Sequence, residues 1–326
     1  MMTTMAVLSL WAYGGAAGAA AAVAVGLVLL YVWLVRRSSS YDRRTSFEYE
    51  CAVSGERQPF PSAERVALSV VIPAFNEERR IGPTLQSAVG YLTGREGAGQ
   101  TWEVIVVDDG SGDATADVVQ RFAGGRGLAN VRVLRSERNW GKGSAVRRGM
   151  LAMNGDYALM ADADGATAIA DVEALQRRLR MNGSGEGVAV GSRAALRNEE
   201  TLAQRSALRR LLMAGFHAIV SAIVDVRGIA DTQCGFKLFS RNAAKRIFAS
   251  MHVDRWAFDV EALFKARQMG IPVVEVPVHF EDVAGSKLHV VDATLTMLRD
   301  IVVLRLMYAL GLWTHCPPGP EKPKRL

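Results

Sequence analysis

Short apolar runs alternate with helical patterns through the middle of the chain. The runs consist mainly of valine, isoleucine, leucine and alanine, and they lie at 68–73, 104–107, 131–134, 157–161 and 188–190. Helical patterns follow the first four runs, at 81–92, 114–122, 144–153 and 171–180. Strands without an alternating polar face are typical of a parallel sheet that is buried on both sides, and the segments between them are long enough for parallel crossovers. The pattern therefore predicts an α/β, Rossmann-like fold with a mostly parallel central sheet.

The alternation of strands and helices ends near residue 200. An apolar helix is predicted at 202–226, a polar loop at 231–235 and a further helix at 258–268. The apolar run at 271–278 contains two prolines, which cannot donate to a central ladder. We therefore expect an edge strand there.

The last apolar stretch covers residues 290–312 and contains Arg299, Asp300 and Arg305. Charges at this spacing argue against a transmembrane span and predict an amphipathic C-terminal helix. Such a helix can lie on a membrane or on the domain, and the sequence leaves both possibilities open.

The N-terminal segment is strongly apolar, and residues 1–35 contain no charged side chain. Its second part, 16–35, is about twenty residues long, which is enough to cross a hydrocarbon core of roughly 30 Å. Arg36 and Arg37 follow directly, and the positive-inside rule places the rest of the chain in the cytosol. A cleaved signal peptide is the alternative, but the segment lacks a basic start and is longer than the apolar part of such peptides. We therefore expect one uncleaved transmembrane helix.

These patterns divide the chain into four parts. They are a membrane anchor (1–36), a juxtamembrane linker (37–66), an α/β catalytic domain (67–285) and a C-terminal, membrane-associated amphipathic helix with a tail (286–326).

The net charge and the cysteines narrow the range of partners. The charge is +6, from 39 basic and 33 acidic residues, and this excess is too small to predict a nucleic-acid partner. Beside a membrane anchor, it favours contact with anionic membrane lipid or with a lipid phosphate. Cys51, Cys234 and Cys316 are far apart and odd in number, so they predict neither a disulfide framework nor a zinc site. This agrees with a reducing, cytosolic compartment.

Carboxylates follow two of the predicted strands. Asp108 and Asp109 come directly after the run at 104–107, and Asp162 and Asp164 come after the run at 157–161. Ligands of open α/β sheets bind beyond the carboxyl ends of the strands, and side chains two residues apart on an extended segment point the same way. Oxygen ligands of this kind suit Mg²⁺ or Mn²⁺ carrying phosphates, although an exposed Asp-Gly turn is the alternative. The pattern predicts nucleotide-dependent chemistry.

Two loops offer further polar groups at the same end of the predicted sheet. Glu77 follows the first strand, although it could simply favour the next helix through the helix dipole. The segment 139–144 contains glycines, Lys142 and a following helix start, which are the parts of a phosphate loop, but it lacks the Walker spacing.

Basic residues follow the fifth run and continue onto the next predicted helix. Arg193 comes three residues after the run, and Arg205 and Arg209 lie on the helix. The planar fork of arginine suits phosphate, whereas a solvated basic face is the alternative for each of them. The polar loop 231–237 lies between apolar segments, and such a loop at a pocket edge is a functional hint.

Several of these segments together resemble family 2 glycosyltransferases with the glycosyltransferase-A fold. The resemblance lies in 68–77, 107–111, 139–143 and 162–164. Three later motifs and the single N-terminal span are similar to those of the members that transfer glucose to dolichyl phosphate at the endoplasmic reticulum membrane. These motifs lie at 231–239, 255–261 and 285–288.

The resemblance implies inverting transfer of glucose from UDP-glucose to dolichyl phosphate, with a divalent cation, Mg²⁺ or Mn²⁺, as cofactor. It also implies a role for each candidate residue. The nucleotide sugar would contact Pro73, Phe75, Glu77, Asp108, Asp109, Lys142, Asp162 and Ala163; the metal would contact Asp162 and Asp164; the acceptor phosphate would contact Arg193, Arg205 and Arg209; and Asp164, Asp231 and Lys237 would be catalytic. Related mannosyltransferases often carry a glutamine where this chain has Ala166, which puts a third side-chain ligand in doubt.

Three other functions stay open at this point. They are a mannosyltransferase that uses GDP-mannose with the same acceptor, a sugar nucleotidyltransferase, and a membrane-tethered binding module without catalysis. The glucosyltransferase interpretation places the enzyme in the endoplasmic reticulum membrane with its catalytic domain on the cytosolic face. The sequence does not indicate an oligomeric state.

Overall fold

The computed structural model describes residue 26 and the ranges 47–50, 57–60, 64–96, 99–193, 228–281 and 290–314. In this part of the chain, none of the helices combines the length and the hydrophobicity needed to cross a membrane. The helix predicted at 202–226 lies outside the described residues, and so does the anchor predicted at 1–36, except for Gly26.

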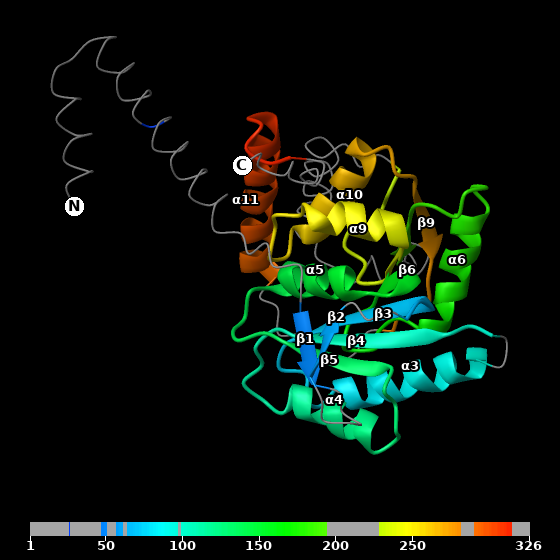
Figure 1. The fold of residues 1–326 in the computed structure, drawn as a ribbon. Helices are drawn as coiled ribbons and strands as arrows, with labels where there is room; N and C mark the ends of the chain where they lie inside the picture. The colour runs from blue at the N-terminus through cyan, green and yellow to red at the C-terminus, as the bar shows by residue number, and fades with distance from the viewer. Residues whose placement is uncertain are drawn as a thin grey trace, which may run out of the picture.

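A seven-stranded sheet forms the centre of the molecule, in the order β5-β4-β3-β6-β8-β7-β9 (Figure 1). Strand β8 is antiparallel to both neighbours, and the other strands all run in one direction. The strands are β3 (Val66–Ala74), β4 (Trp102–Asp108), β5 (Val131–Arg135), β6 (Gly155–Met160), β7 (Val188–Ser192), β8 (Lys237–Ser240) and β9 (Val273–Pro277). The prediction of a mostly parallel α/β sheet is therefore confirmed.

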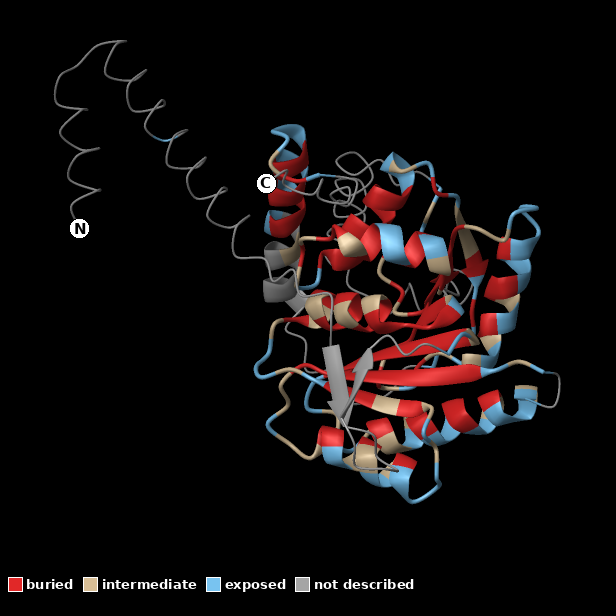
Figure 2. Ribbon diagram, in the orientation of Figure 1, coloured by how far each residue is buried: buried red, intermediate tan, exposed pale blue. Residues whose placement is uncertain are grey.

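Helices cover both faces of the sheet, so that the strands between them are almost wholly buried (Figure 2). One face packs against α3 (Ile81–Glu96), α4 (Thr115–Gly124) and α6 (Val172–Arg180), the last preceded by the short 3₁₀ helix η1 (Ile169–Asp171). The other face packs against α5 (Lys142–Ala152), α9 (Arg241–Ala249), α10 (Phe258–Gln268) and α11 (Val290–Ala309). Apolar side chains that alternate along β3 enter the two cores in turn, because successive residues of a strand point to opposite faces.

Some elements differ from those that the sequence pattern predicts. The pattern misses β8 and the helix α9 that follows it, and it misses a small antiparallel ribbon, β1 (Phe47–Glu50) with β2 (Arg57–Phe60), within the predicted linker. Strand β8 is only four residues long and begins with a lysine, so it gives little periodic signal. By contrast, β9 lies at the edge of the sheet, as its prolines predict.

Helix α11 has two unlike faces over its described side chains. Ile301, Leu304 and Met307 are buried in the same core as α10, whereas Val302 and Leu306 are exposed. One face of α11 is therefore packed on the domain, whereas the amphipathic character of the helix stays a prediction, because the exposed side chains named here are apolar too. Contact of the other face with a membrane stays a prediction.

Candidate active site

The predicted site segments converge at one edge of the sheet. In the strand register, Ala74 at the end of β3 lies beside Asp108 at the end of β4, and Met160 at the end of β6 lies beside Lys237 at the start of β8. Because β3 also pairs with β6, through Val71 and Met160, the acidic segments after β4 and β6 open onto the same side of the molecule. Strand β8 adds a segment that the sequence pattern does not place there.

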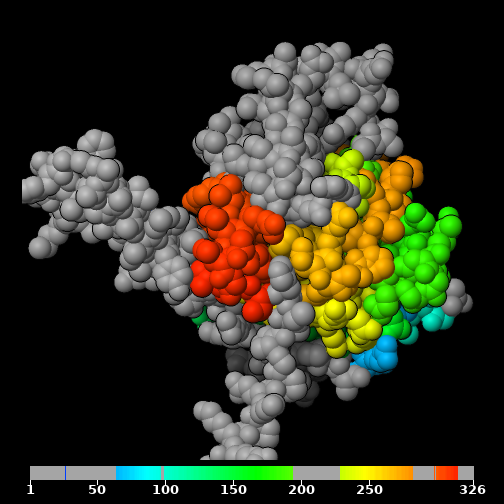
Figure 3. All heavy atoms as spheres, turned by 90° about the horizontal axis from the view of Figure 1, so that it is seen from above, coloured from blue at the N-terminus to red at the C-terminus, as the bar shows by residue number. Residues whose placement is uncertain are grey.

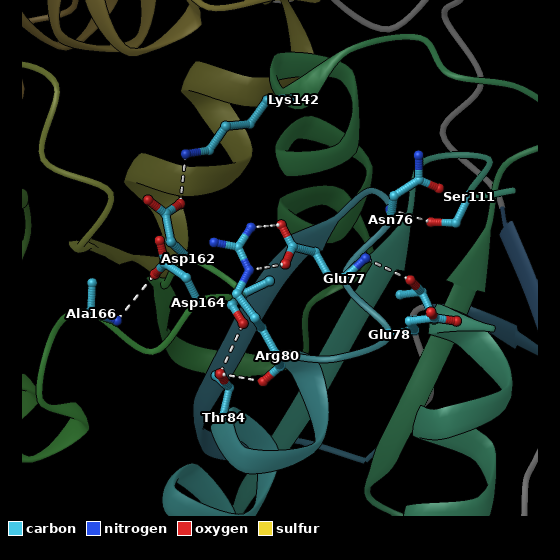
Figure 4. A network of polar contacts seen from close by, with 12 residues as sticks. Asn76, Glu77, Glu78, Arg80, Thr84, Ser111, Lys142, Asp162, Asp164 and Ala166 are labelled. Atoms are coloured by element: carbon cyan, nitrogen blue, oxygen red, sulfur yellow. Dashed lines mark hydrogen bonds and ion pairs between the residues drawn. The ribbon is translucent and has the colours of Figure 1, made fainter. Parts of the chain in front are cut away.

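Asp162 and Asp164 lie between two basic side chains (Figure 4). The Lys142 ammonium is 2.6 Å from Oδ1 of Asp162, and Asp164 Oδ1 accepts a hydrogen bond from the Ala166 N–H at 3.1 Å. On the other side, the hydrogen bonds from Arg80 to Glu77 raise the pKa of Arg80, and the charges of Asp164 and Asp162 add to this rise. With the Glu77 carboxylate included, three acidic side chains meet two basic ones here, so this group of charges is net negative.

Arg80 is a site residue that the sequence analysis misses. Its Nε and Nη2 donate to the two carboxylate oxygens of Glu77 at 2.6 and 2.5 Å, and this pair holds the guanidinium near the acidic segment. The available signal is a basic residue directly before the helix that follows the first strand. Thr84, one turn further along, donates to the Ala163 carbonyl at 2.8 Å and fixes the backbone between the two aspartates.

The acidic pair fits a divalent cation that is held jointly with a substrate. Among the residues that the structure describes, no group of three or more histidine, cysteine or acidic side chains is placed to hold a metal. Two carboxylates are, however, the usual protein contribution for Mg²⁺ that also binds substrate phosphates. Ala166 offers no side-chain ligand, and its N–H is engaged by Asp164. A cavity of about 170 Å³ opens beside both aspartates, with Thr84 and Gly165 in its wall.

Lys142 belongs to a larger group of charges. The Lys237 ammonium donates to Asp259 Oδ1 and to the Cys234 carbonyl, both at 2.6 Å. Burial alone would lower the pKa of Lys142, but the charges of Asp162 and Asp259 outweigh burial and raise it, so its side chain stays protonated. Burial raises the pKa of Asp259 despite the nearby lysines. Lys237 itself is almost fully buried behind this group, and its catalytic role stays a prediction.

Asp108 and Asp109 are both buried at the end of β4 and bind backbone amides. Asp109 accepts the N–H groups of Trp140 and Gly141 at 3.1 and 2.7 Å, so it fixes the loop that precedes Lys142. Burial raises the pKa of Asp109, and these two hydrogen bonds only partly offset the rise. Asp108 accepts the Ser111 N–H at 3.0 Å. Their contact with a nucleotide stays a prediction, and the structure adds a structural role for Asp109.

The loop after β3 is joined to the loop after β4. Asn76 has a φ of 56°, a conformation that asparagine tolerates better than most residues. Its N–H donates to Ser111 Oγ and its Oδ1 accepts the Gly112 N–H, both at 2.9 Å. Pro73 is buried within β3, whereas Phe75, directly after the strand, is exposed. Phe75 is therefore available to a ligand.

Arg193 and Asp231, which the sequence assigns separate roles, form one bidentate pair. The Nε and Nη2 of Arg193 donate to the Asp231 carboxylate at 2.7 and 2.8 Å. Burial alone would raise the pKa of Asp231, but the hydrogen bonds and charge of Arg193 outweigh it and lower the pKa. The Glu275 carboxylate accepts the Asp231 N–H at 3.0 Å and holds this loop in place. The other predicted acceptor ligands, Arg205 and Arg209, lie outside the described residues.

Open α/β sheets bind nucleotides and other ligands in the crevice beyond the carboxyl ends of their strands, and the acidic side chains and Lys142 lie at that edge here. The family model described as Glycosyl transferase family 2 matches residues 69–248, and the chain belongs to this family. More specifically, curated relatives with the name dolichyl-phosphate beta-glucosyltransferase match most of the chain. The protein of Homo sapiens is 41% identical over 314 residues, which cover 94% of this chain and 96% of the human one. That of Saccharomyces cerevisiae is 40% identical and covers 77% of each chain.

Solved structures support the fold. Glucosyl-3-phosphoglycerate synthase from Mycobacterium tuberculosis, in complex with UDP, has a TM-score of 0.53 and 20% identity, covering 76% of this chain and 80% of the other. The same enzyme with Mn²⁺, UDP-glucose and phosphoglyceric acid has a TM-score of 0.50, 18% identity and coverage of 76% and 80%.

Proposed function

We propose that this protein transfers glucose from UDP-glucose to dolichyl phosphate, with inversion, and forms dolichyl β-glucosyl phosphate for protein N-glycosylation. The observation that carries the proposal is the match, over nearly the whole chain, to relatives with the name dolichyl-phosphate beta-glucosyltransferase. The site supports it, because Asp162, Asp164 and Lys142 lie together at the sheet edge where nucleotides bind.

In this proposal the two aspartates hold Mg²⁺ or Mn²⁺ together with the diphosphate of the donor. The cation, when bound, offsets negative charge that develops on the departing UDP. Lys142 is protonated and lies 2.6 Å from Asp162, so its ammonium can reach a phosphate bound at the same place. Fixed cations near the leaving group stabilise the transition state without reorganising during the reaction.

The acceptor side of the reaction needs positioning more than proton removal. A phosphate monoester has a second pKa of about 6, so the acceptor is mostly dianionic at neutral pH and is already a nucleophile. Arg193 would bind this phosphate, and the bidentate contact with Asp231 holds its guanidinium in one orientation. This gives Asp231 an orienting role beside its predicted catalytic one.

The membrane is the proposed source of the acceptor. Val302, Leu306 and Leu310 are 42%, 38% and 54% exposed. Val302 and Leu306 lie four residues apart on one side of α11, and Leu310 follows directly after the end of the helix. Helix α11 lies on the outside of the molecule and packs in the same core as α10 (Figure 3). Arg299 and Arg305 are exposed on the same helix and would favour anionic headgroups. With the anchor predicted at 1–36, we propose a location in the endoplasmic reticulum membrane, with the catalytic domain on the cytosolic face.

An assay with purified full-length protein in detergent tests the proposed reaction. Dolichyl phosphate and Mn²⁺ or Mg²⁺ are supplied with labelled UDP-glucose or labelled GDP-mannose. Label should enter the lipid from UDP-glucose and should not enter when EDTA removes the cation. Lipid labelled only from GDP-mannose would contradict the donor, and UDP-glucose formed from glucose 1-phosphate and UTP would favour a nucleotidyltransferase.

Protease protection in sealed microsomes tests the location separately. The catalytic domain should be digested without detergent, because it would face the cytosol. Protection of the domain until detergent is added would contradict the proposed orientation.

A further inference from the structure

Glu261 on α10 is a fully buried carboxylate that the proposed reaction does not use. It accepts the N–H of His252 at 3.0 Å and the N–H of Val253 at 2.7 Å, and it also accepts the hydroxyl of Tyr308 on α11 at 2.7 Å. Burial would raise the pKa of Glu261, but hydrogen bonds to His252 and the positive charge of Lys265 contribute to a net lowering. A single ionised group therefore joins α11 to the loop between α9 and α10.

That loop lies directly against the turn that carries Lys142. The Asp254 carbonyl accepts the N–H of Ser144, in the first turn of α5, at 3.0 Å. Gly143 is so close that an added Cβ would lie 2.5 Å from the Val253 carbonyl oxygen. A Cβ added at Gly141, which has a φ of 112°, would come similarly close to the Asp254 carbonyl oxygen. A shift of the loop therefore moves the turn from which Lys142 reaches Asp162.

The turn that follows α11 also contacts the loop. The ring of Trp313 stacks on His252 with centroids 4.5 Å apart and an interplanar angle of 7°. Tyr308 meets Trp313 edge to face at 5.7 Å. The contacts thus run without a gap from α11, through Glu261 and His252, to the start of α5.

We propose that Glu261 and Tyr308 are positioning residues that make the placement of Lys142 depend on the docking of α11. Their effect passes through the 252–254 loop, whose His252 and Val253 amides Glu261 binds directly. The expected effect on nucleotide binding rests on the proposed function, whereas the expected effect on the loop does not.

Tyr308→Phe tests the network with little change in packing, because it removes one hydroxyl. Hydrogen exchange measured by mass spectrometry on the full-length protein in detergent should become faster in peptides covering 139–145 and 251–255. Tyr91→Phe is the matched control, since the Tyr91 hydroxyl donates to Glu173 at 2.6 Å between α3 and α6, away from this network. It should leave both peptides unchanged. Exchange in 139–145 that is no faster in Tyr308→Phe than in Tyr91→Phe would overturn the proposal.

Binding of UDP with Mn²⁺, followed by calorimetry, is the second measurement. Tyr308→Phe should weaken UDP binding roughly three- to tenfold, since a lysine that is less well placed loses part of a charge-assisted contact. Its melting temperature should stay within a few degrees of the wild-type value. Glu261→Gln, which keeps the side-chain volume, should act in the same direction. Wild-type affinity in both variants would overturn the positioning role, while wild-type protein that does not bind UDP would count against the proposed function only.

Discussion

Gly235 offers a sharp test of how closely the position of Asp162 is set. A Cβ added at Gly235 would lie 2.7 Å from Oδ1 of Asp162 and closer still to Oδ2, whereas ordinary contacts of a Cβ begin near 3.4 Å. In Gly235→Ala the nearest atom, Oδ2 at 2.0 Å from the added Cβ, must therefore retreat by about 1.4 Å to reach an ordinary contact. A displacement of about 1 Å in a catalytic group can reduce the rate roughly a hundredfold, and we expect a loss of that order.

The same substitution should change stability little. Gly235 has no left-handed φ, so alanine fits its backbone, and the atoms in the way are the far end of the Asp162 side chain rather than backbone. We expect the free energy of unfolding to fall by less than about 1 kcal/mol. This prediction separates an effect on the site from an effect on the fold.

The assay compares glucose transfer, Mn²⁺ affinity and urea unfolding for wild type, Gly235→Ala and a control. Gly90→Ala is the control, because Gly90 lies on the exposed side of α3 and an added Cβ meets nothing within 4 Å. It should keep wild-type activity and become slightly more stable, since alanine is the better helix former. Near-normal transfer by Gly235→Ala would refute the reasoning that Asp162 must stay where the structure places it.

Three further outcomes are expected. Asp164→Asn should lower cation-dependent transfer about a hundredfold or more, with an unchanged circular dichroism spectrum, because it removes one of two metal-binding charges; normal turnover would contradict the metal role. The folded pKa of Glu261 lies below its ordinary value of 4.5, so its stabilising effect is present above that value and is lost as the pH falls through the lowered pKa. The difference in unfolding free energy between wild type and Glu261→Gln should therefore shrink below about pH 4.5, and a constant difference would contradict this sign. Burial raises the pKa of the Cys234 thiol, so iodoacetamide at pH 8 should modify Cys234, as judged by peptide mass, only after denaturation.

The sheet and its acidic edge follow from local sequence pattern. Runs such as 104–107 and 157–161 are apolar on both faces, and this property is sufficient to predict buried parallel strands. Carboxylates directly after those runs must then lie at the carboxyl edge, because parallel strands end on the same side. For this reason the sequence alone is enough to place Asp162 and Asp164 at that edge.

The remaining parts of the site depend on contacts that no local pattern contains. Strand β8 enters the sheet in the antiparallel sense from far along the chain, and only this insertion brings Gly235 and Lys237 beside the segment after β6. The arginine fork at Arg193 suggests a phosphate ligand, but its pairing with Asp231 comes from the folded loop. Sequence pattern gives residue types that can do chemistry, and the tertiary fold decides which of them meet.

Helix α10 shows most clearly why such contacts cannot be predicted from local sequence pattern. From Phe258 to Ala266 every residue is buried, although the segment carries Asp259, Glu261 and Lys265. An unpaired charge in such a place costs several kcal/mol, so each must meet a partner, and the partners come from separate elements. Asp259 meets Lys237 of β8, Glu261 meets Tyr308 of α11, and Lys265 donates to the Thr314 carbonyl at 3.2 Å. A buried contact of this kind is stable only when both groups are present, so these charges require β8, α10 and α11 to pack together. The same contacts therefore connect α11, which we propose faces the membrane, with the edge of the sheet where the donor would bind.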